Sequence, residues 1–253
     1  SDEPYAQWNE REAAARATVG RPAIEVDQLS QFIHQAVNDI RMNTPAINVI
    51  PDGEGSDMET AEILSGRIKA IEYKSKADTA YDMAAEFAVK SSIGFIRVDH
   101  DYADDDGFNQ ELKICRVINP SAVLIDPHSV ELDGSDAKYG FIFEEMDVSE
   151  FKRRWPKATP MSFGEEDKNR KYGDDDKVTI AEYFVIKDEE EERGLLDDGK
   201  AEPVAEGKEY KRKRKIKKPK VMRYKLAFQD ELESTTFPGK YIPIVPVYGE
   251  EAW

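Results

Sequence analysis

Cysteine, histidine and long apolar runs are all scarce in this chain of 253 residues. The single cysteine, Cys115, excludes an internal disulfide and a cysteine-based zinc site, so a reducing compartment is the expected setting. The three histidines, His34, His100 and His128, stand far apart and lack the paired spacing of a zinc-protease helix. No stretch reaches the roughly 18 to 20 apolar residues of a membrane-spanning helix, so we expect no membrane partner.

Positive charge is also in deficit. The chain has 36 Lys and Arg against 52 Asp and Glu, a net charge of −16, and its mean hydropathy is −0.68. Such an acidic chain repels nucleic-acid phosphate at long range unless a local basic patch overrides the repulsion. One such patch exists: residues 208–225 hold eleven Lys and Arg and one Glu, a local charge of +10 that leaves −26 on the rest of the chain.

The spacing of apolar residues changes after Ser92. Before this point, intervals of three and four residues predict helices over 5–19 and 25–43, then two more between 56 and 92 with a break near Ser75. A short apolar run at 46–51 suggests a strand between them.

After Ser92, alternating apolar and polar residues predict five strands, at 93–98, 112–118, 139–143, 178–186 and 221–228. A short helix is expected over 148–155, and the proline-containing run 242–247 belongs on a sheet edge, because proline donates no ladder hydrogen bond. The order predicts an α+β fold in which N-terminal helices (1–92) pack on a mostly antiparallel β-sheet (93–253).

Two segments resemble nucleotide or metal sites, but each has an unsuitable residue at a position that the site requires. Residues 194–201 match a phosphate-binding P-loop, but Ala201 stands where Ser or Thr would hold magnesium. Residues 104–107 are similar to a calcium loop, yet Tyr102 and Lys113 occupy its first and twelfth ligand positions. We therefore predict no catalytic residues, no metal, no cofactor and no enzyme activity.

Two charged tracts are candidates for a contact surface. The basic tract, predicted to contact a neighbouring subunit or nucleic acid, comprises Lys211, Arg212, Lys213, Arg214, Lys215, Lys217, Lys218 and Lys220. Its acidic counterpart comprises Asp188, Glu189, Glu190, Glu191 and Glu192. The basic tract is either one arm of a surface hairpin that runs into a strand at Val221, or the partner of the acidic tract, within one chain or across a subunit boundary. No aromatic residues interleave with its cations, so base stacking is not indicated.

Several phrases of the sequence resemble one family in order along the chain. They are Asn-Asp-Ile-Arg-Met-Asn-Thr-Pro at 38–45, the run 47–51, Glu-Thr-Ala-Glu at 59–62, Ile-Glu-Tyr at 71–73, Ala-Tyr-Asp at 80–82, Asn-Pro at 119–120, Asp-Pro at 126–127, Arg-Tyr-Lys at 223–225 and Phe-Pro-Gly-Lys-Tyr-Ile-Pro-Ile-Val at 237–245. Together these phrases resemble the P22-like bacteriophage portal proteins.

The resemblance implies a structural subunit of a ring at one capsid vertex, dodecameric when full length. Such a ring forms the conduit for DNA packaging and ejection, with DNA passing through the channel without sequence readout. The implied partners are the terminase, scaffold or capsid protein, and tail or head-completion proteins. The implied location is the portal vertex of the virion, and the host cytoplasm during assembly.

By this resemblance the chain corresponds to the N-terminal, wing-like region and ends before the long stem helices. Because it begins with Ser and stops abruptly at Trp253, we expect a piece of a longer protein. An alternative function stays open, a nucleic-acid-binding accessory module acting through the basic segment 208–225. Duplex affinity that falls steeply with salt would distinguish this module from a portal wing.

Overall fold

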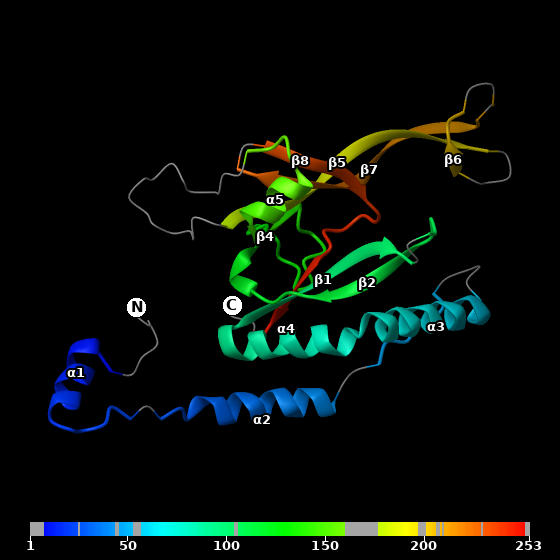
Figure 1. Cartoon of the computed structure of the whole chain (residues 1–253). Helices are drawn as coiled ribbons and strands as arrows, with labels where there is room; N and C mark the ends of the chain where they lie inside the picture. Colours follow the sequence, from blue (N-terminus) through cyan, green and yellow to red (C-terminus); the bar gives the residue numbers. More distant parts are fainter. Residues whose placement is uncertain are drawn as a thin grey trace. The chain divides into compact units, whose positions relative to one another are not determined.

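The computed structural model describes residues 8–250 except 25, 44–45, 53–56, 104–105, 160–176, 197–200, 206–207, 209 and 229. The chain divides into two compact units, Ser1–Pro45 and Ala46–Trp253. The helices and strands of both units are labelled in Figure 1.

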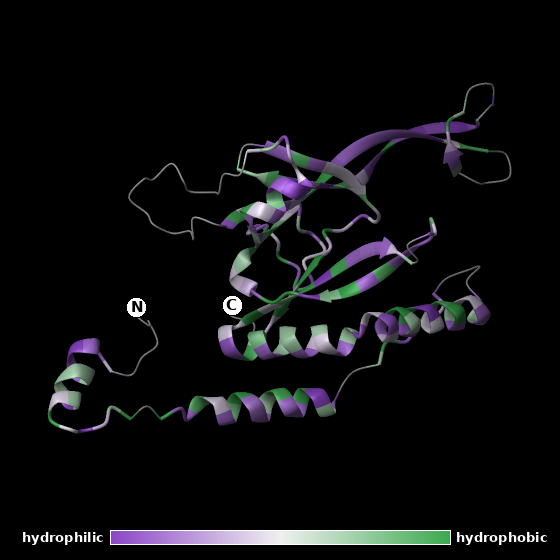
Figure 2. Cartoon of the chain, in the orientation of Figure 1, coloured by the Kyte–Doolittle hydropathy of each residue, from purple (hydrophilic) through white to green (hydrophobic). Residues whose placement is uncertain are grey.

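The described part of the first unit holds two helices, α1 (Glu10–Thr18) and α2 (Leu29–Met42). The side chain of Asn9 caps α1 by accepting a hydrogen bond from the amide of Arg11. The helix ends before Gly20, whose φ of +69° suits glycine. Green and purple alternate along α2 in Figure 2, as expected of an amphipathic helix. Both helices lie inside the predicted ranges.

In the second unit, α3 (Met58–Ser75) and α4 (Ala77–Ser91) are separated by one residue. That residue, Lys76, has a left-handed φ of 51°, which ends α3 at the predicted break. The start of α3 is fixed by Asp57, whose Oδ1 accepts a hydrogen bond from the amide of Thr60 at 2.8 Å.

The first sheet has the strand order β2-β1-β9 and is antiparallel throughout. Its strands are β1 (Ile93–Tyr102), β2 (Gln110–Arg116) and β9 (Ile244–Tyr248). Pro246 lies opposite Phe95 on β9, an edge strand, so the predicted edge position of this run is confirmed.

Small residues let α4 approach this sheet closely. The buried side chains of α4 are all alanines, at positions 77, 80, 84 and 88. Gly94 of β1 lies directly beneath them, and a Cβ at this glycine would stand 2.1 Å from the carbonyl oxygen of Ala84. The helix therefore packs backbone against backbone, which only glycine at position 94 allows.

The second sheet is also antiparallel, with the order β3-β4-β5-β7-β8 and β6 paired to β5. Its strands are β3 (Val123–Ile125), β4 (Tyr139–Asp147), β5 (Lys177–Leu195), β6 (Ala201–Pro203), β7 (Arg212–Ala227) and β8 (Asp230–Phe237). A 3-10 turn, η1 (Pro120–Ala122), precedes β3, and helix α5 (Val148–Arg154) follows β4 inside its predicted range.

The main core forms where the two sheets face each other. Phe95 and Ile244 from the first sheet pack with Ile142, Phe184 and Val221 from the second, each at most 8% exposed. A smaller cluster around the fully buried Phe151 joins α5 to β5 and β7. Since every large side chain removed from water stabilises the fold by about 1.5 to 3 kcal/mol, these clusters hold the layers together.

The α+β fold with a mostly antiparallel sheet is confirmed. The strand expected at 46–51 is wrong, because the structure gives residues 46–52 no strand pairing. The short strands β3 and β6 and the strand β8 were not predicted, and β5 and β7 extend further than expected. The division at 92/93 separates α4 from β1, and as a domain boundary it stays a prediction. Among the described helices, none has the length and apolar character required to cross a bilayer.

Candidate interaction surface on the long ribbon

The structure brings the acidic and basic tracts together within one chain. In the antiparallel pairing of β5 with β7, Glu189 lies opposite Lys218, Glu190 opposite Lys217 and Glu192 opposite Lys215. This part of the pair, residues 187–195 and 212–220, runs past β4 and β8 as a ribbon whose far end also pairs with the short strand β6 (Figure 1), and it is strongly hydrophilic (Figure 2). The basic tract is therefore a strand, and one arm of a hairpin, before it reaches Val221.

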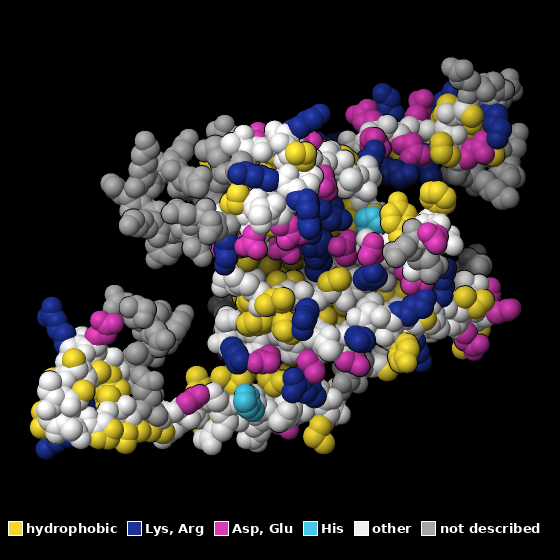
Figure 3. Space-filling model, in the orientation of Figure 1, with side chains coloured by type: hydrophobic (Ala, Val, Ile, Leu, Met, Phe, Trp, Pro, Cys, Tyr) yellow, Lys and Arg dark blue, Asp and Glu magenta, His cyan; other side chains and the backbone are white. Residues whose placement is uncertain are grey.

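The register gives the ribbon two faces of different charge, because alternate residues of a strand point to opposite faces. The cationic face has six cations and two carboxylates, a net +4, from Lys187, Glu189, Glu191, Arg193, Arg212, Arg214, Lys218 and Lys220. The mixed face has three of each sign and is neutral, from Asp188, Glu190, Glu192, Lys213, Lys215 and Lys217. Basic and acidic side chains are accordingly interspersed along the ribbon in Figure 3.

Diagonal ion pairs connect the two strands on the cationic face. Lys218 reaches Glu191 at 3.5 Å, and Lys220 reaches Glu189 at 3.2 Å. A third contact, Arg193 Nε to Glu191 Oε1 at 3.4 Å, lies within β5. Exposed cross-strand pairs of this kind each contribute roughly 0.2 to 1 kcal/mol, so together they fix the register more than they stabilise the fold.

The pairs on the mixed face are longer. Lys215 lies 3.9 Å from Glu190, and Lys217 lies 3.9 Å from Asp188. These two carboxylate side chains are 69% and 53% exposed, so both remain open to a partner in solution.

The far end of the ribbon carries cations without an ion pair to any described residue, namely Arg212, Lys213 and Arg214. With Arg193, Leu195 and Ile216 they line a hollow of about 630 Å³. Tyr210 fits against the adjacent Gly194, where a Cβ would stand 2.2 Å from its ring. Guanidinium groups beside apolar side chains form a surface suited to carboxylates or phosphates.

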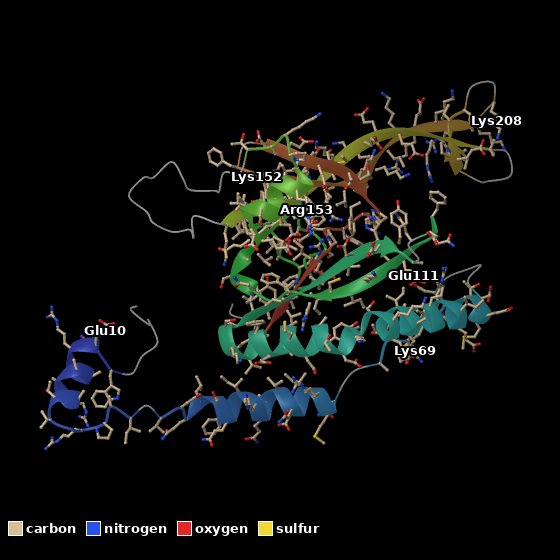
Figure 4. All side chains as sticks on the ribbon, in the orientation of Figure 1. Glu10, Lys69, Glu111, Lys152, Arg153 and Lys208 are labelled. Atoms are coloured by element: carbon tan, nitrogen blue, oxygen red, sulfur yellow. The ribbon has the colours of Figure 1, made fainter. Side chains whose placement is uncertain are left out.

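The turn beyond β6 is held by a charged contact. Lys208, labelled in Figure 4, donates to Glu202 at 2.8 Å, and the hydroxyl of Tyr210 donates to the same carboxylate at 3.1 Å. The hydrogen bond from Lys208 is the main reason that the pKa of Glu202 is lowered, and it raises the pKa of Lys208 in turn. Both groups therefore keep their charges at neutral pH.

An aromatic row crosses β4, β5 and β7 on the face that continues into the cationic face. Phe141 stacks on Tyr183 with ring centroids 4.4 Å apart, and Tyr183 stacks on Tyr224 at 6.1 Å. Lys187 ends the row, lying 5.1 Å above the Tyr224 ring and donating to its hydroxyl at 2.7 Å. This hydrogen bond raises the pKa of Lys187, while burial raises the pKa of Tyr183.

A largely buried ionic cluster ties the two sheets together, and sequence reasoning did not find it. Arg97 of β1 contacts Glu182 of β5 at 2.6 Å and Asp99 at 2.7 Å. Arg223 of β7 contacts the same Glu182 and lies 3.4 Å from Asp99. The available signal was the presence of Arg97, Glu182 and Arg223 next to apolar residues in predicted strands.

Several other segments were considered from sequence, and their described residues are placed as follows. Within the described ranges, no group of three or more His, Cys, Asp or Glu is placed to hold a metal ion. His100 packs edge-on against Phe237, and burial raises the pKa of the Cys115 thiol. Gly194 and Leu195 of the P-loop-like segment belong to β5, whereas 197–200 lie outside the described residues, as do 104–105 of the calcium-like loop.

The second unit is a layered α+β fold that carries a charged ribbon with two unlike faces. Comparison with known proteins identifies the group: the chain belongs to the phage P22-like portal protein family, whose sequence model matches residues 1–253. It is 25% identical over 275 residues to a portal protein of Acyrthosiphon pisum secondary endosymbiont phage 1. That match covers 98% of this chain and 38% of the relative, so the chain spans well under half of the relative's length.

Proposed function

We propose that the chain is part of a subunit of the portal ring at the capsid vertex, where it helps to form the conduit for DNA packaging and ejection. The observation that carries this proposal is the family match over residues 1–253. In this role the terminase and the tail or head-completion proteins dock on the assembled ring, and scaffold or capsid protein surrounds it. The ring is located at the portal vertex of the virion and assembles in the host cytoplasm.

The charge of the chain supports a conduit rather than a DNA clamp. DNA has to slide through a portal, and a chain of net charge −16 repels phosphate instead of holding it. Four of the eight cations of the basic tract, Lys215, Lys217, Lys218 and Lys220, lie at ion-pair distance from carboxylates of β5. The positive charge of the tract is therefore partly neutralised within the chain, which weakens its attraction for DNA.

We also propose that the protein works without chemistry of its own. A portal subunit acts by assembling with other subunits, and the free energy of this assembly comes from contacts between their surfaces. In a ring these contacts are heterologous, so one surface of a subunit meets a different surface of the next. The two unlike faces of the ribbon fit such a requirement.

The proposal is tested by deleting the corresponding gene from the phage or prophage that carries it. We expect capsids that assemble but contain no DNA and bear no tails, counted by electron microscopy and by nuclease-protected DNA. Complementation with the intact gene should restore filled particles. Filled, tailed particles formed without the gene would contradict the proposed function.

The alternative, a nucleic-acid-binding module, rests on Arg212, Arg214 and their neighbours in residues 208–225. For that module, affinity for a DNA duplex should fall steeply as salt rises, with a slope near one unit per phosphate contacted. For a portal wing, we expect little affinity at about 0.15 M salt. Fluorescence anisotropy with a labelled duplex over a salt series separates the two functions.

A further inference from the structure

We propose that the cationic face of the ribbon binds a second copy of this chain, through the acidic row Asp188, Glu190 and Glu192 on that copy's mixed face. The inference rests on the proposed function, because it names a contact by which neighbouring subunits meet. Each ribbon then offers its cationic face to one neighbour and its acidic row to the other.

The difference in charge between the two faces is the first support. The cationic face carries +4 in a chain whose total is −16, so it is a local exception to the charge of the molecule. Arg212 and Arg214 make no ion pair with any described residue. Cations without a counter-charge among the described residues are candidates for pairing with another molecule.

The geometry of the acidic row is the second support. Alternate residues of a strand are about 6.6 to 6.8 Å apart, so Glu190 and Glu192 repeat at the same interval as Arg212 and Arg214. Two ribbons stacked at about 10 Å, the usual spacing of packed sheets, bring such side chains into contact. The side chains of Asp188 and Glu190 are 53% and 69% exposed, and their internal partners lie 3.9 Å away.

The composition of the face favours protein over nucleic acid as the partner. Leu195 and Ile216 lie among the arginines, and Phe141, Tyr183 and Tyr224 continue the same face toward the middle of the sheet. Tyrosine, phenylalanine and arginine are the residues enriched in protein interfaces. Apolar side chains have no counterpart on a phosphate backbone, and the carboxylates of the same face would repel one.

The test compares two charge reversals on alternate positions of one strand. Arg212→Glu with Arg214→Glu alters the cationic face, whereas Lys215→Glu with Lys217→Glu makes the same change in net charge on the mixed face, at residues outside the hollow. Self-association is measured by sedimentation velocity at about 20 mM and about 500 mM salt, where screening differs strongly. Circular dichroism melts check that each variant is folded.

We expect the parent chain to associate at low salt and to dissociate at high salt. The change on the cationic face should weaken association about tenfold or more, since it places like charges opposite each other. The change on the mixed face should leave association unchanged or tighten it, because it adds to the acidic row. If the variant with Arg212→Glu and Arg214→Glu does not fold, Arg212→Gln with Arg214→Gln replaces it and should also weaken association.

A parent chain that stays monomeric at low salt would overturn the inference, and so would equal weakening by both reversals. Loss of duplex-DNA binding by the change on the cationic face, with self-association unaltered, would assign that face to nucleic acid instead. Rings formed by the whole natural protein despite Arg212→Glu with Arg214→Glu would overturn this contact and leave the proposed function standing. Absence of rings from the unaltered whole protein would remove the proposed function itself.

Discussion

Replacing Glu182 by Ala is expected to destabilise the second unit strongly. Its carboxylate, 11% exposed, neutralises two guanidinium groups, those of Arg97 and Arg223, which are 17% and 19% exposed. Without it, Asp99 alone faces both cations. Removing one partner of a largely buried ion pair leaves an uncompensated charge and costs about 3 to 5 kcal/mol.

The assay is thermal denaturation of the parent and the variant, followed by circular dichroism. For a unit of this size, the expected loss corresponds to a fall in Tm of roughly 10 °C. Glu190→Ala is the matched control, because its carboxylate is 69% exposed and paired at 3.9 Å, and it should cost less than about 1 kcal/mol. The reasoning fails if both variants lose the same stability.

A double-mutant cycle sharpens this test. Removing Arg97 as well as Glu182 takes away part of the positive charge left without a partner. The losses of unfolding free energy in the two single variants should therefore sum to more than the loss in the double variant. Additive losses would mean that the two side chains do not act as one cluster.

Three further outcomes are expected. Gly94→Ala should destabilise the fold by about 1 to 3 kcal/mol, because the new methyl group meets the backbone of Ala84. Gly66→Ala, in an open part of α3, should stabilise the fold by up to about 1 kcal/mol. Thermal melts of both variants give the sign of each change. Hydrogen bonds from backbone amides lower the pKa of Asp126, so its contribution is present above the ordinary pKa of about 3.9 and is lost as pH falls through the lowered value. The stability difference between the parent and Asp126→Asn should therefore shrink on acidification, and a pH-independent difference would be contrary evidence. Because burial raises the pKa of Cys115, its reaction with a disulfide reagent at pH 8 should be slower than that of a free thiol and should reach the free-thiol rate in urea; an equally fast reaction in the folded chain would refute this.

Features set by local chemistry were predictable from the sequence. The break between α3 and α4 was predicted near Ser75, between two successive apolar stripes, and the structure ends α3 there with the left-handed residue Lys76. The edge position of Pro246 follows from its missing amide hydrogen. Neither conclusion needs knowledge of a distant partner, which explains why both hold.

Features set by distant partners were not predictable in the same way. Residues 212–220 have almost no apolar alternation, yet they form a strand because β5 supplies a hydrogen-bond ladder and opposite charges. Strand β8 (Asp230–Phe237) is similarly polar and depends on its pairing with β7. Conversely, the apolar run 46–51 looks like a strand, but no strand pairs with it among the described residues.

The candidate surface shows the same division between local and distant information. Composition alone pointed to the acidic and basic tracts, and the structure places them side by side. The separation into a cationic and a mixed face depends on register, since a shift by one residue would exchange the two faces. The cluster around Glu182 depends on two sheets meeting, which no local pattern specifies.

Native mass spectrometry of the whole protein, expressed from the natural reading frame that contains this chain, tests the central claim most directly. A portal subunit should appear as one closed oligomer of about twelve copies, the number implied by the family resemblance, formed by heterologous contacts. A monomer or dimer that instead binds a DNA duplex with a steep dependence on salt would contradict the portal function and assign the ribbon to nucleic-acid binding.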